Sequence, residues 1–236
     1  MPLDFKKERK DLYEPKTTPS IIDVPEMVFI AVDGKGDPNT SAEYAAAIEV
    51  LYGFSYTIKM GNKSVLEYVV PPLEGLWSVD ESFFAGSGEG MADGAGGTGG
   101  AEGAGGAGEE GIAGTAGMID KSKFTWTALI RQPDFVTPEV FEAAKVSLAK
   151  KKPELDTSKA RLETITEGLC VQVMYIGSYD NEPATIAAMN RYAVENGYAI
   201  DISDTRRHHE IYLGDPRKVV PDKLKTIIRH PVRKAE

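Results

Sequence analysis

The sequence predicts an α+β fold in which two β-α-β-β units form one antiparallel sheet with helices on one face. The first observation is a partly hidden repeat, because the apolar runs Val28–Val32 and Val171–Ile176 both lead into a glycine turn and an Asp/Pro helix start. The second is that both following helix-period stretches close with a glycine and an aromatic residue, at 53–54 and 197–198. Duplicated halves imply a pseudo-two-fold axis, and a central groove on that axis is a natural ligand site.

The first unit is predicted from β-branched and apolar runs around one long helix. Ser20–Val32 is typical of a strand, with a break at Pro25. Asp37 and Asn39 provide turn and capping chemistry before an amphipathic helix over 41–59. Two short strands are expected at 65–70 and 73–79, separated by a pair of prolines.

The second unit is predicted in the same way, after one additional helix. Residues 124–131 form a strand, and Thr137 and Pro138 start the additional helix as N-cap and first helical residue. The elements that follow are strands at 161–166 and 169–178, a helix at 183–196, strands at 198–202 and 208–213, and at 221–228 a short helix or a strand preceded by a turn.

A glycine- and alanine-rich segment interrupts this pattern at 85–117. It holds 15 of the chain's 24 glycines and no lysine, arginine or aromatic residue. Such a composition buries too little apolar surface to offset the entropy of an ordered backbone, so a flexible insertion is expected. The predicted organisation is an N-terminal lead-in at 1–17, extended or partly ordered, and one ligand-binding domain at 18–236 that contains this insertion.

Composition limits the classes of partner. The net charge of −9 argues against nonspecific nucleic-acid binding, which depends on neutralising phosphates. No run approaches the roughly 18 apolar residues that span a membrane. The charged N-terminus lacks the apolar core of a signal peptide, and the single cysteine, Cys170, allows no intrachain disulfide. We therefore expect a cytoplasmic protein without membrane contact; the oligomeric state stays open.

Aromatic residues are the first candidate constellation. Trp77 and Trp126 lie on predicted strands, while several tyrosines lie on the first helix and in the second half, among them Tyr175, Tyr179 and Tyr212. Core packing explains such residues most simply, because aromatic side chains dominate protein interiors. The alternative is an aromatic-walled pocket for a flat organic ligand.

The second constellation is His208-His209-Glu210-Ile211-Tyr212. On a strand, His208, Glu210 and Tyr212 point to one face and His209 to the other. Glu210 belongs either to a solvent-facing ladder or to a pocket, where it can pair with a cation or act as an acid or base. Because adjacent strand residues diverge, the two histidines do not predict a metal site. No cofactor is expected either.

Four motifs together resemble the GyrI-like small-molecule-binding proteins, stand-alone relatives of the effector-binding domains of multidrug-responsive activators. They are PPLEGLW at 71–77, WTALIRQPDFVT at 126–137, MYIGSYD at 174–180 and HEIYLGDPR at 209–217. The resemblance implies a duplicated strand-helix-strand-strand fold around a ligand groove. It also implies that Glu210 is the groove carboxylate, with Trp77, Trp126, Tyr212 and Tyr175 as wall residues.

Three functions remain open at this stage. The first is capture of flat aromatic or cationic xenobiotics in the groove. The second, which the resemblance suggests, is hydrolysis of electrophilic cyclopropane-type DNA-alkylating compounds with Glu210 as the catalytic carboxylate. The third is recruitment of a protein partner at a sheet edge. No direct nucleic-acid binding is expected, because the N-terminal residues show no helix-turn-helix pattern.

Overall fold

The computed structural model describes residues 2–78 and 124–236, with the side chain of residue 180 left out. Seven strands form one antiparallel sheet in the order β4-β1-β3-β2-β6-β7-β5, and β4 also pairs with β7. This extra pairing curls six of the strands into a closed barrel, with β5 attached outside. The α+β class is confirmed, but the closure was not predicted. The glycine-rich insertion predicted at 85–117 lies outside the described residues.

The strands and helices follow the predicted order. The strands are β1 (Ser20–Lys35), β2 (Leu73–Ser78), β3 (Thr125–Gln132), β4 (Arg161–Ile176), β5 (Tyr198–Ile200), β6 (His208–Tyr212) and β7 (Lys225–Lys234). The helices are α1 (Phe5–Glu8), α2 (Lys10–Tyr13), α3 (Ala42–Gly61), α5 (Pro138–Lys151) and α6 (Glu182–Glu195), with short 3-10 turns η2 (Tyr179–Asn181) and η3 (Pro221–Lys223).

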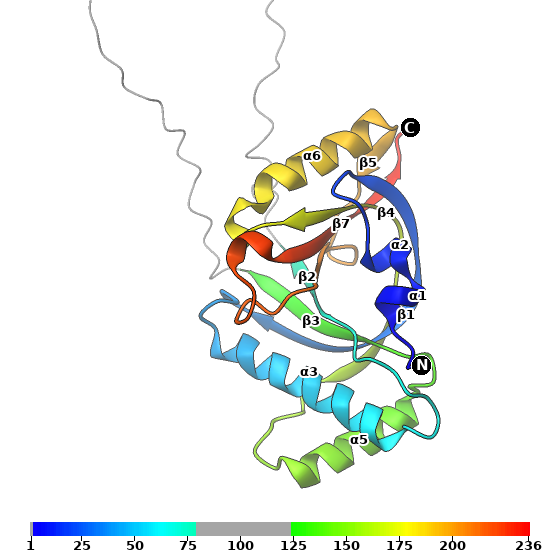
Figure 1. The fold of residues 1–236 in the computed structure, drawn as a ribbon, viewed down its shortest axis with the longest axis vertical. Helices are drawn as coiled ribbons and strands as arrows, with labels where there is room; N and C mark the ends of the chain where they lie inside the picture. The colour runs from blue at the N-terminus through cyan, green and yellow to red at the C-terminus, as the bar shows by residue number, and fades with distance from the viewer. Residues whose placement is uncertain (1, 79–123) are drawn as a thin grey trace, which may run out of the picture.

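The pairing of strands carries the internal symmetry that the repeat predicts. Within the first half, β3 pairs with both β1 and β2; within the second, β7 pairs with both β4 and β6. The halves join through equivalent strands, β1 to β4 and β2 to β6. The β2–β6 seam therefore lies where a pseudo-two-fold axis relates the halves. Figure 1 shows the equivalent helices α3 and α6 towards opposite ends of the molecule, with the sheet between them.

Helices cover the outer face of the barrel, as predicted. The side chains of α3 and α5 share a core with outward residues of β1 and β3, while α6 packs on β4 and β7. Ser41 and Thr137 accept hydrogen bonds from backbone amides in the first turns of α3 and α5, which fixes where both helices begin. The inner face is filled by a third apolar cluster.

The structure corrects or refines several local predictions. Within residues 1–17, expected to be extended or partly ordered, α1 and α2 bury Phe5, Leu12 and Tyr13 against the inner face. Residues 65–70 form no strand; Tyr68 makes one isolated bridge to Leu3. The strands expected at 161–166 and 169–178 are one strand. At 221–228 the second of the two expected alternatives is found, because the turn η3 precedes the ten-residue strand β7.

The expected break at Pro25 takes the form of an interruption of the β1–β4 ladder, without a change of register. Val24 pairs with Gly168 and Glu26 with Thr166, so that Pro25 and Glu167 have no partner in the ladder. Gly168 adopts a positive φ of 64°, which glycine tolerates. Side-chain alternation changes phase at this interruption, which turns both Glu167 and Cys170 towards the interior.

Candidate functional site

The candidate site lies on the outer face of the β2–β6 seam. In that seam Gly75 stands opposite Glu210, Trp77 opposite His208 and Leu73 opposite Tyr212. Strand alternation sends His208, Glu210 and Tyr212 to the outer face, as the sequence predicts. Glycine at position 75 matters, because a Cβ there would lie 2.8 Å from the Trp77 Nε1 and 3.1 Å from the Tyr212 hydroxyl oxygen.

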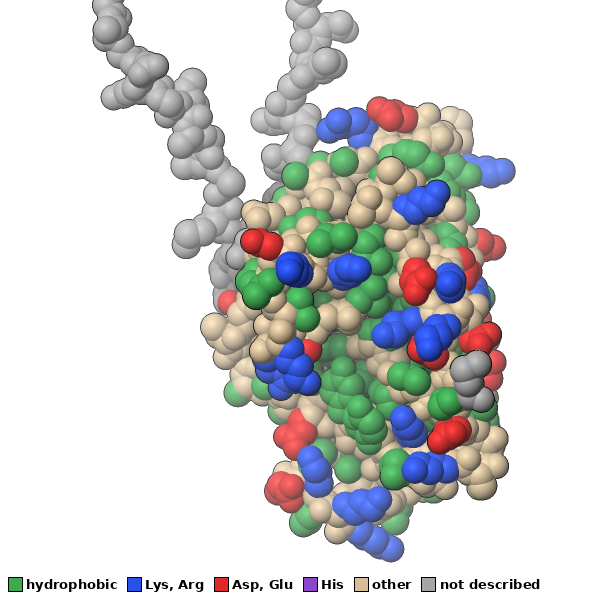
Figure 2. All heavy atoms as spheres, viewed as in Figure 1, with side chains coloured by type: hydrophobic (Ala, Val, Ile, Leu, Met, Phe, Trp, Pro, Cys, Tyr) green, Lys and Arg blue, Asp and Glu red, His purple; other side chains and the backbone are tan. Residues whose placement is uncertain are grey.

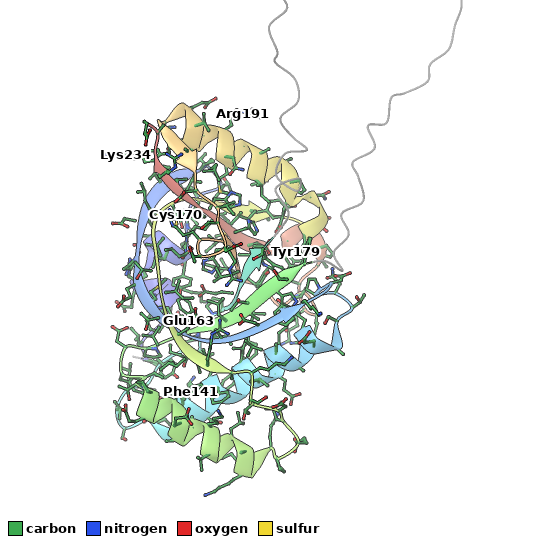
Figure 3. The ribbon with its side chains drawn as sticks, turned by 180° about the vertical axis from the view of Figure 1, so that it is seen from behind. Phe141, Glu163, Cys170, Tyr179, Arg191 and Lys234 are labelled. Atoms are coloured by element: carbon green, nitrogen blue, oxygen red, sulfur yellow. The ribbon has the colours of Figure 1, made fainter. Side chains whose placement is uncertain are left out.

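Four aromatic side chains from four different elements surround Glu210. The Trp77 Nε1 donates a hydrogen bond of 3.0 Å to the Tyr212 hydroxyl oxygen. The ring of Tyr44, from α3, lies 6.1 Å from that of Trp77, and the ring of Tyr179, beside the start of α6, packs edge-on at 5.9 Å from that of Tyr212. Figure 3 labels Tyr179 at this end of the sheet. Elements of both halves thus enclose one carboxylate.

The tyrosines around Glu210 stay protonated over the ordinary pH range. Burial, followed by the charge of Glu210, raises the pKa of Tyr212 and of Tyr44 well above the usual value. Burial and the carboxylates Glu182 and Glu210 raise the pKa of Tyr179 to about 12. The hydroxyls are therefore neutral groups, and Tyr212 is hydrogen-bonded to Glu210. Negative charge at this site comes from carboxylates.

Glu210 is held by a buried histidine. Its Oε1 lies 2.8 Å from the His208 Nε2, with side chains that are 15% and 2% exposed respectively. The alternative of a solvent-facing ladder is therefore wrong, and Glu210 is a carboxylate with limited access to water. Behind it, the His208 Nδ1 lies 2.7 Å from the His230 Nε2, and the His230 Nδ1 lies 2.7 Å from the Asn190 Oδ1.

The remaining predicted wall residues lie apart from Glu210. Trp126 is 1% exposed and packs edge-on against Tyr44, with ring centroids 4.8 Å apart. Its ring therefore supports the Tyr44 ring from behind. Tyr175 belongs to the apolar cluster beneath α6, and its hydroxyl donates a hydrogen bond to the Ser178 carbonyl oxygen at 2.7 Å. The structure brings Glu210, Trp77 and Tyr212 together and leaves Tyr175 elsewhere.

Sequence reasoning missed part of the site. Tyr44 and Tyr179 were visible as aromatic residues, but only the fold places them beside Glu210. His230 and Asn190 carried no signal, because they lie 20 residues or more from Glu210 in the chain and meet it only through the β6–β7 pairing and α6. No group of three or more metal-ligating side chains with suitable geometry occurs among the described residues.

The inner face of β6 carries a different polar cluster. The His209 Nδ1 lies 2.9 Å from the Glu167 Oε1 and its Nε2 lies 3.0 Å from the Glu74 Oε2. The Arg229 Nη1 donates to the Glu167 Oε2 at 2.7 Å. Burial alone lowers the pKa of His209, but Glu167 and Glu74 outweigh that effect and raise it to about 9. These groups form a closed ion network inside the barrel.

The surface adds two observations. Acidic and basic side chains alternate over the described part of the face in Figure 2, which shows no basic stripe of the kind that follows a nucleic-acid backbone. In the part of the chain that the structure describes, no helix has the length and apolar character needed to span a bilayer.

Comparisons with known proteins agree with this architecture. The sequence profile of the GyrI-like small molecule binding domain matches residues 124–233. An uncharacterised conserved protein from Listeria innocua shares 42% identity with a TM-score of 0.79, covering 98% of this chain and all of that one. A structure described as a hydrolase from the same organism shares 40% identity with a TM-score of 0.78, over the same proportions.

A more distant likeness concerns the fold alone. EcmrR, in a complex with DNA, shares 11% identity with a TM-score of 0.50, covering 98% of this chain and 61% of that one. No protein of curated function matches the sequence significantly. The profile match, the full-length likeness at 42% identity and the duplicated fold show that the chain belongs to the GyrI-like family of small-molecule-binding domains.

Proposed function

We propose that this protein captures flat aromatic cations in the cytoplasm, at the outer face of the β2–β6 seam. The observation that carries the proposal is one carboxylate of limited exposure, Glu210, among the rings of Trp77, Tyr44, Tyr179 and Tyr212. Aromatic faces attract cations by about 0.5–2 kcal/mol each, depending on exposure. A carboxylate in the same place adds charge attraction that a neutral ligand does not receive.

Binding of two isosteric probes tests this function. N-methylacridinium carries a permanent charge, and 9-methylanthracene has the same shape without it. Fluorescence titration should show the cation binding at least about tenfold more tightly, equivalent to about 1.4 kcal/mol. Trp77→Ala should weaken both probes, because it removes a ring wall. Lys152→Met, a change in an exposed ion pair on α5, should alter neither affinity. Absence of binding by both probes would contradict the proposal.

A hydrolase is the second candidate, favoured by the hydrogen-bonded chain behind Glu210 and by the relatives described as hydrolases. In this alternative the substrate is an electrophilic, cyclopropane-type alkylating compound. Glu210 accepts a proton from water as the water oxygen attacks the ring carbon, the strained carbon–carbon bond breaks, and its electron pair passes into the substrate's conjugated carbonyl system, where a proton is taken up.

Product analysis separates the two candidates. Incubation of a cyclopropane-containing alkylator with wild type should yield a product one water heavier, detected by mass spectrometry, if the protein is a hydrolase. Glu210→Gln should then abolish turnover while the affinity for 9-methylanthracene stays within about twofold, since the aromatic walls remain. Binding of the cation without any product would leave capture as the function.

A further inference from the structure

The side chains of Glu210, His208, His230 and Asn190 form one hydrogen-bonded chain that leads away from the aromatic site. The proton positions along this chain follow from its last member, the amide of Asn190. Asn190 presents Oδ1 to His230, and an amide oxygen only accepts, so the His230 Nδ1 carries a hydrogen. His230 is fully buried, and burial together with the nearby His208 lowers its pKa well below the ordinary value. His230 is therefore neutral, and its Nε2 offers a lone pair.

This assignment leaves one choice for the next link. The His208 Nδ1, 2.7 Å from the His230 Nε2, must donate the hydrogen between them. The His208 Nε2 then faces the Glu210 Oε1 across 2.8 Å, and one proton occupies that contact. It resides either on His208, giving an ion pair, or on Glu210, giving two neutral groups. Both arrangements have the same net charge of zero.

The geometry points to His208 and Glu210 as a proton-sharing dyad that releases its proton when a cation binds beside Glu210. This inference deepens the proposed function and rests on it. With the proton present, the dyad is neutral overall and offers a cation little net attraction. With the proton released to solvent, Glu210 is an anion beside a neutral His208, and it is this state that a cation stabilises. Neutral ligands do not favour either state.

The other titratable groups at the dyad do not supply this proton. Tyr44 from α3, Tyr179 from η2 and Tyr212 from β6 are neutral, with raised pKa values. His230 from β7 is already neutral. From α6, Glu182 adds a second carboxylate whose charge acts on Tyr179 and Tyr212, and β2 contributes the non-titrating Trp77. Tyr212 also hydrogen-bonds Glu210, but its raised pKa keeps that proton on the hydroxyl, so the proton available for release is the one between His208 and Glu210.

The dyad itself is tested on the ligand-free protein. Nuclear magnetic resonance of protein labelled with ¹⁵N in histidine and ¹³C in glutamate should show His230 as the neutral Nδ1–H tautomer. The hydrogen in the contact between the His208 Nε2 and the Glu210 Oε1 should give a strongly downfield proton signal, which should move upfield in Glu210→Gln. A His230 that carries its hydrogen on Nε2, or the absence of the downfield signal from wild type, would overturn the inference.

Proton release is tested with the cationic probe. Calorimetric titration of N-methylacridinium in buffers of different ionisation enthalpy should give up to about one proton released per cation bound, and an affinity that rises with pH by at most about tenfold per unit. 9-Methylanthracene should release none. His208→Asn should abolish the release. Glu182→Gln, a matched change in the neighbouring carboxylate, should preserve it.

The outcomes separate the two proposals. Cation binding without proton release in wild type, or with release unchanged in His208→Asn, contradicts the dyad and leaves capture of cations standing. If neither probe binds, the proposed function fails, and the spectra of the ligand-free protein still decide whether His208 and Glu210 share a proton. Circular dichroism of each variant verifies folding, and Glu210→Gln, which preserves side-chain shape, provides a second way to break the dyad.

Discussion

The two faces of β6 carry similar residues, histidines in contact with glutamates, but these residues have different roles. On the inner face, His209 lies between two carboxylates, and Arg229 completes a network in which each charge has an opposite charge beside it. On the outer face, Glu210 contacts a single histidine, which is backed by a neutral histidine and an amide. A buried carboxylate enclosed by cations stabilises a fold, whereas one with a proton-sharing partner and aromatic neighbours can respond to a ligand.

The largest expected loss of stability follows from a substitution in the inner ion network. Arg229→Met removes the hydrogen bond to Glu167 and leaves that carboxylate buried with one cation fewer. Breaking a buried ion pair in this way costs about 3–5 kcal/mol, which urea denaturation would measure as a lower midpoint. Lys152→Met breaks an exposed pair of the same 2.7 Å length with Glu49 and should leave the denaturation midpoint nearly unchanged. Equal losses would contradict the contrast between buried and exposed pairs.

A smaller effect is expected where the first half packs behind the aromatic site. A Cβ on Gly34 would lie 2.2 Å from the Trp126 ring, so Gly34→Ala must displace the ring or the strand. Overpacking of this kind costs about 1–3 kcal/mol. Gly61→Ala has open space around its Cβ and serves as the matched control, without loss of stability. Thermal denaturation of both variants checks the prediction, and an unchanged melting temperature for Gly34→Ala would show that Trp126 is not fixed.

The inner network also predicts how stability depends on pH. The pKa of His209 is raised to about 9, so its contribution is complete below about 6.5 and is lost as the pH rises through 9. Burial raises the pKa of Glu167, but His209 and Arg229 outweigh burial and lower it to about 2. That contribution is present above about 4.5 and is lost as the pH falls towards 2.

Denaturation at a series of pH values measures this profile. The free energy of unfolding should be highest between about pH 4.5 and 6.5 and should decline on the alkaline side between about 6.5 and 9. His209→Gln should remove the alkaline decline while lowering the maximum. A decline that persists in this variant would assign it to another group.

The smallest effect on stability is expected at the ligand-facing carboxylate. Glu210→Gln keeps the size of the side chain and can still hydrogen-bond His208, so the free energy of unfolding should change by about 1 kcal/mol or less. Urea denaturation checks this expectation. A loss comparable with that of Arg229→Met would mean that Glu210 is as much a part of the fold's framework as the inner network.

The sequence predicts the fold well where periodicity and symmetry are strong. The repeated strand-turn-helix pattern predicts β1, α3, β4 and α6, and the alternation of residues 208–212 correctly separates His208 from His209. The barrel closure escapes prediction because it depends on the β1–β4 and β4–β7 pairings, which are long-range features. The buried α1 and α2 escape because four-residue helices carry almost no periodic signal.

The site is predicted in part for the same reason. Glu210, Trp77 and Tyr212 meet because they lie on strands whose faces follow from alternation. Tyr175 was grouped with them by residue type, but its position on β4 beneath α6 places it in another cluster. His230 and Asn190 reach the site through β7 and α6, and only the three-dimensional pairing reveals that they support His208.

Paired measurements on Glu210→Gln and Glu167→Gln test the contrast between the two faces most directly. N-methylacridinium affinity and urea stability would be measured for both variants and for wild type. We expect Glu210→Gln to lose at least about tenfold in cation affinity with nearly unchanged stability, and Glu167→Gln to lose about 3–5 kcal/mol of stability with affinity retained while folded. Cation affinity that is retained in Glu210→Gln, or lost equally in both variants, would contradict the assignment of the outer face as the ligand site.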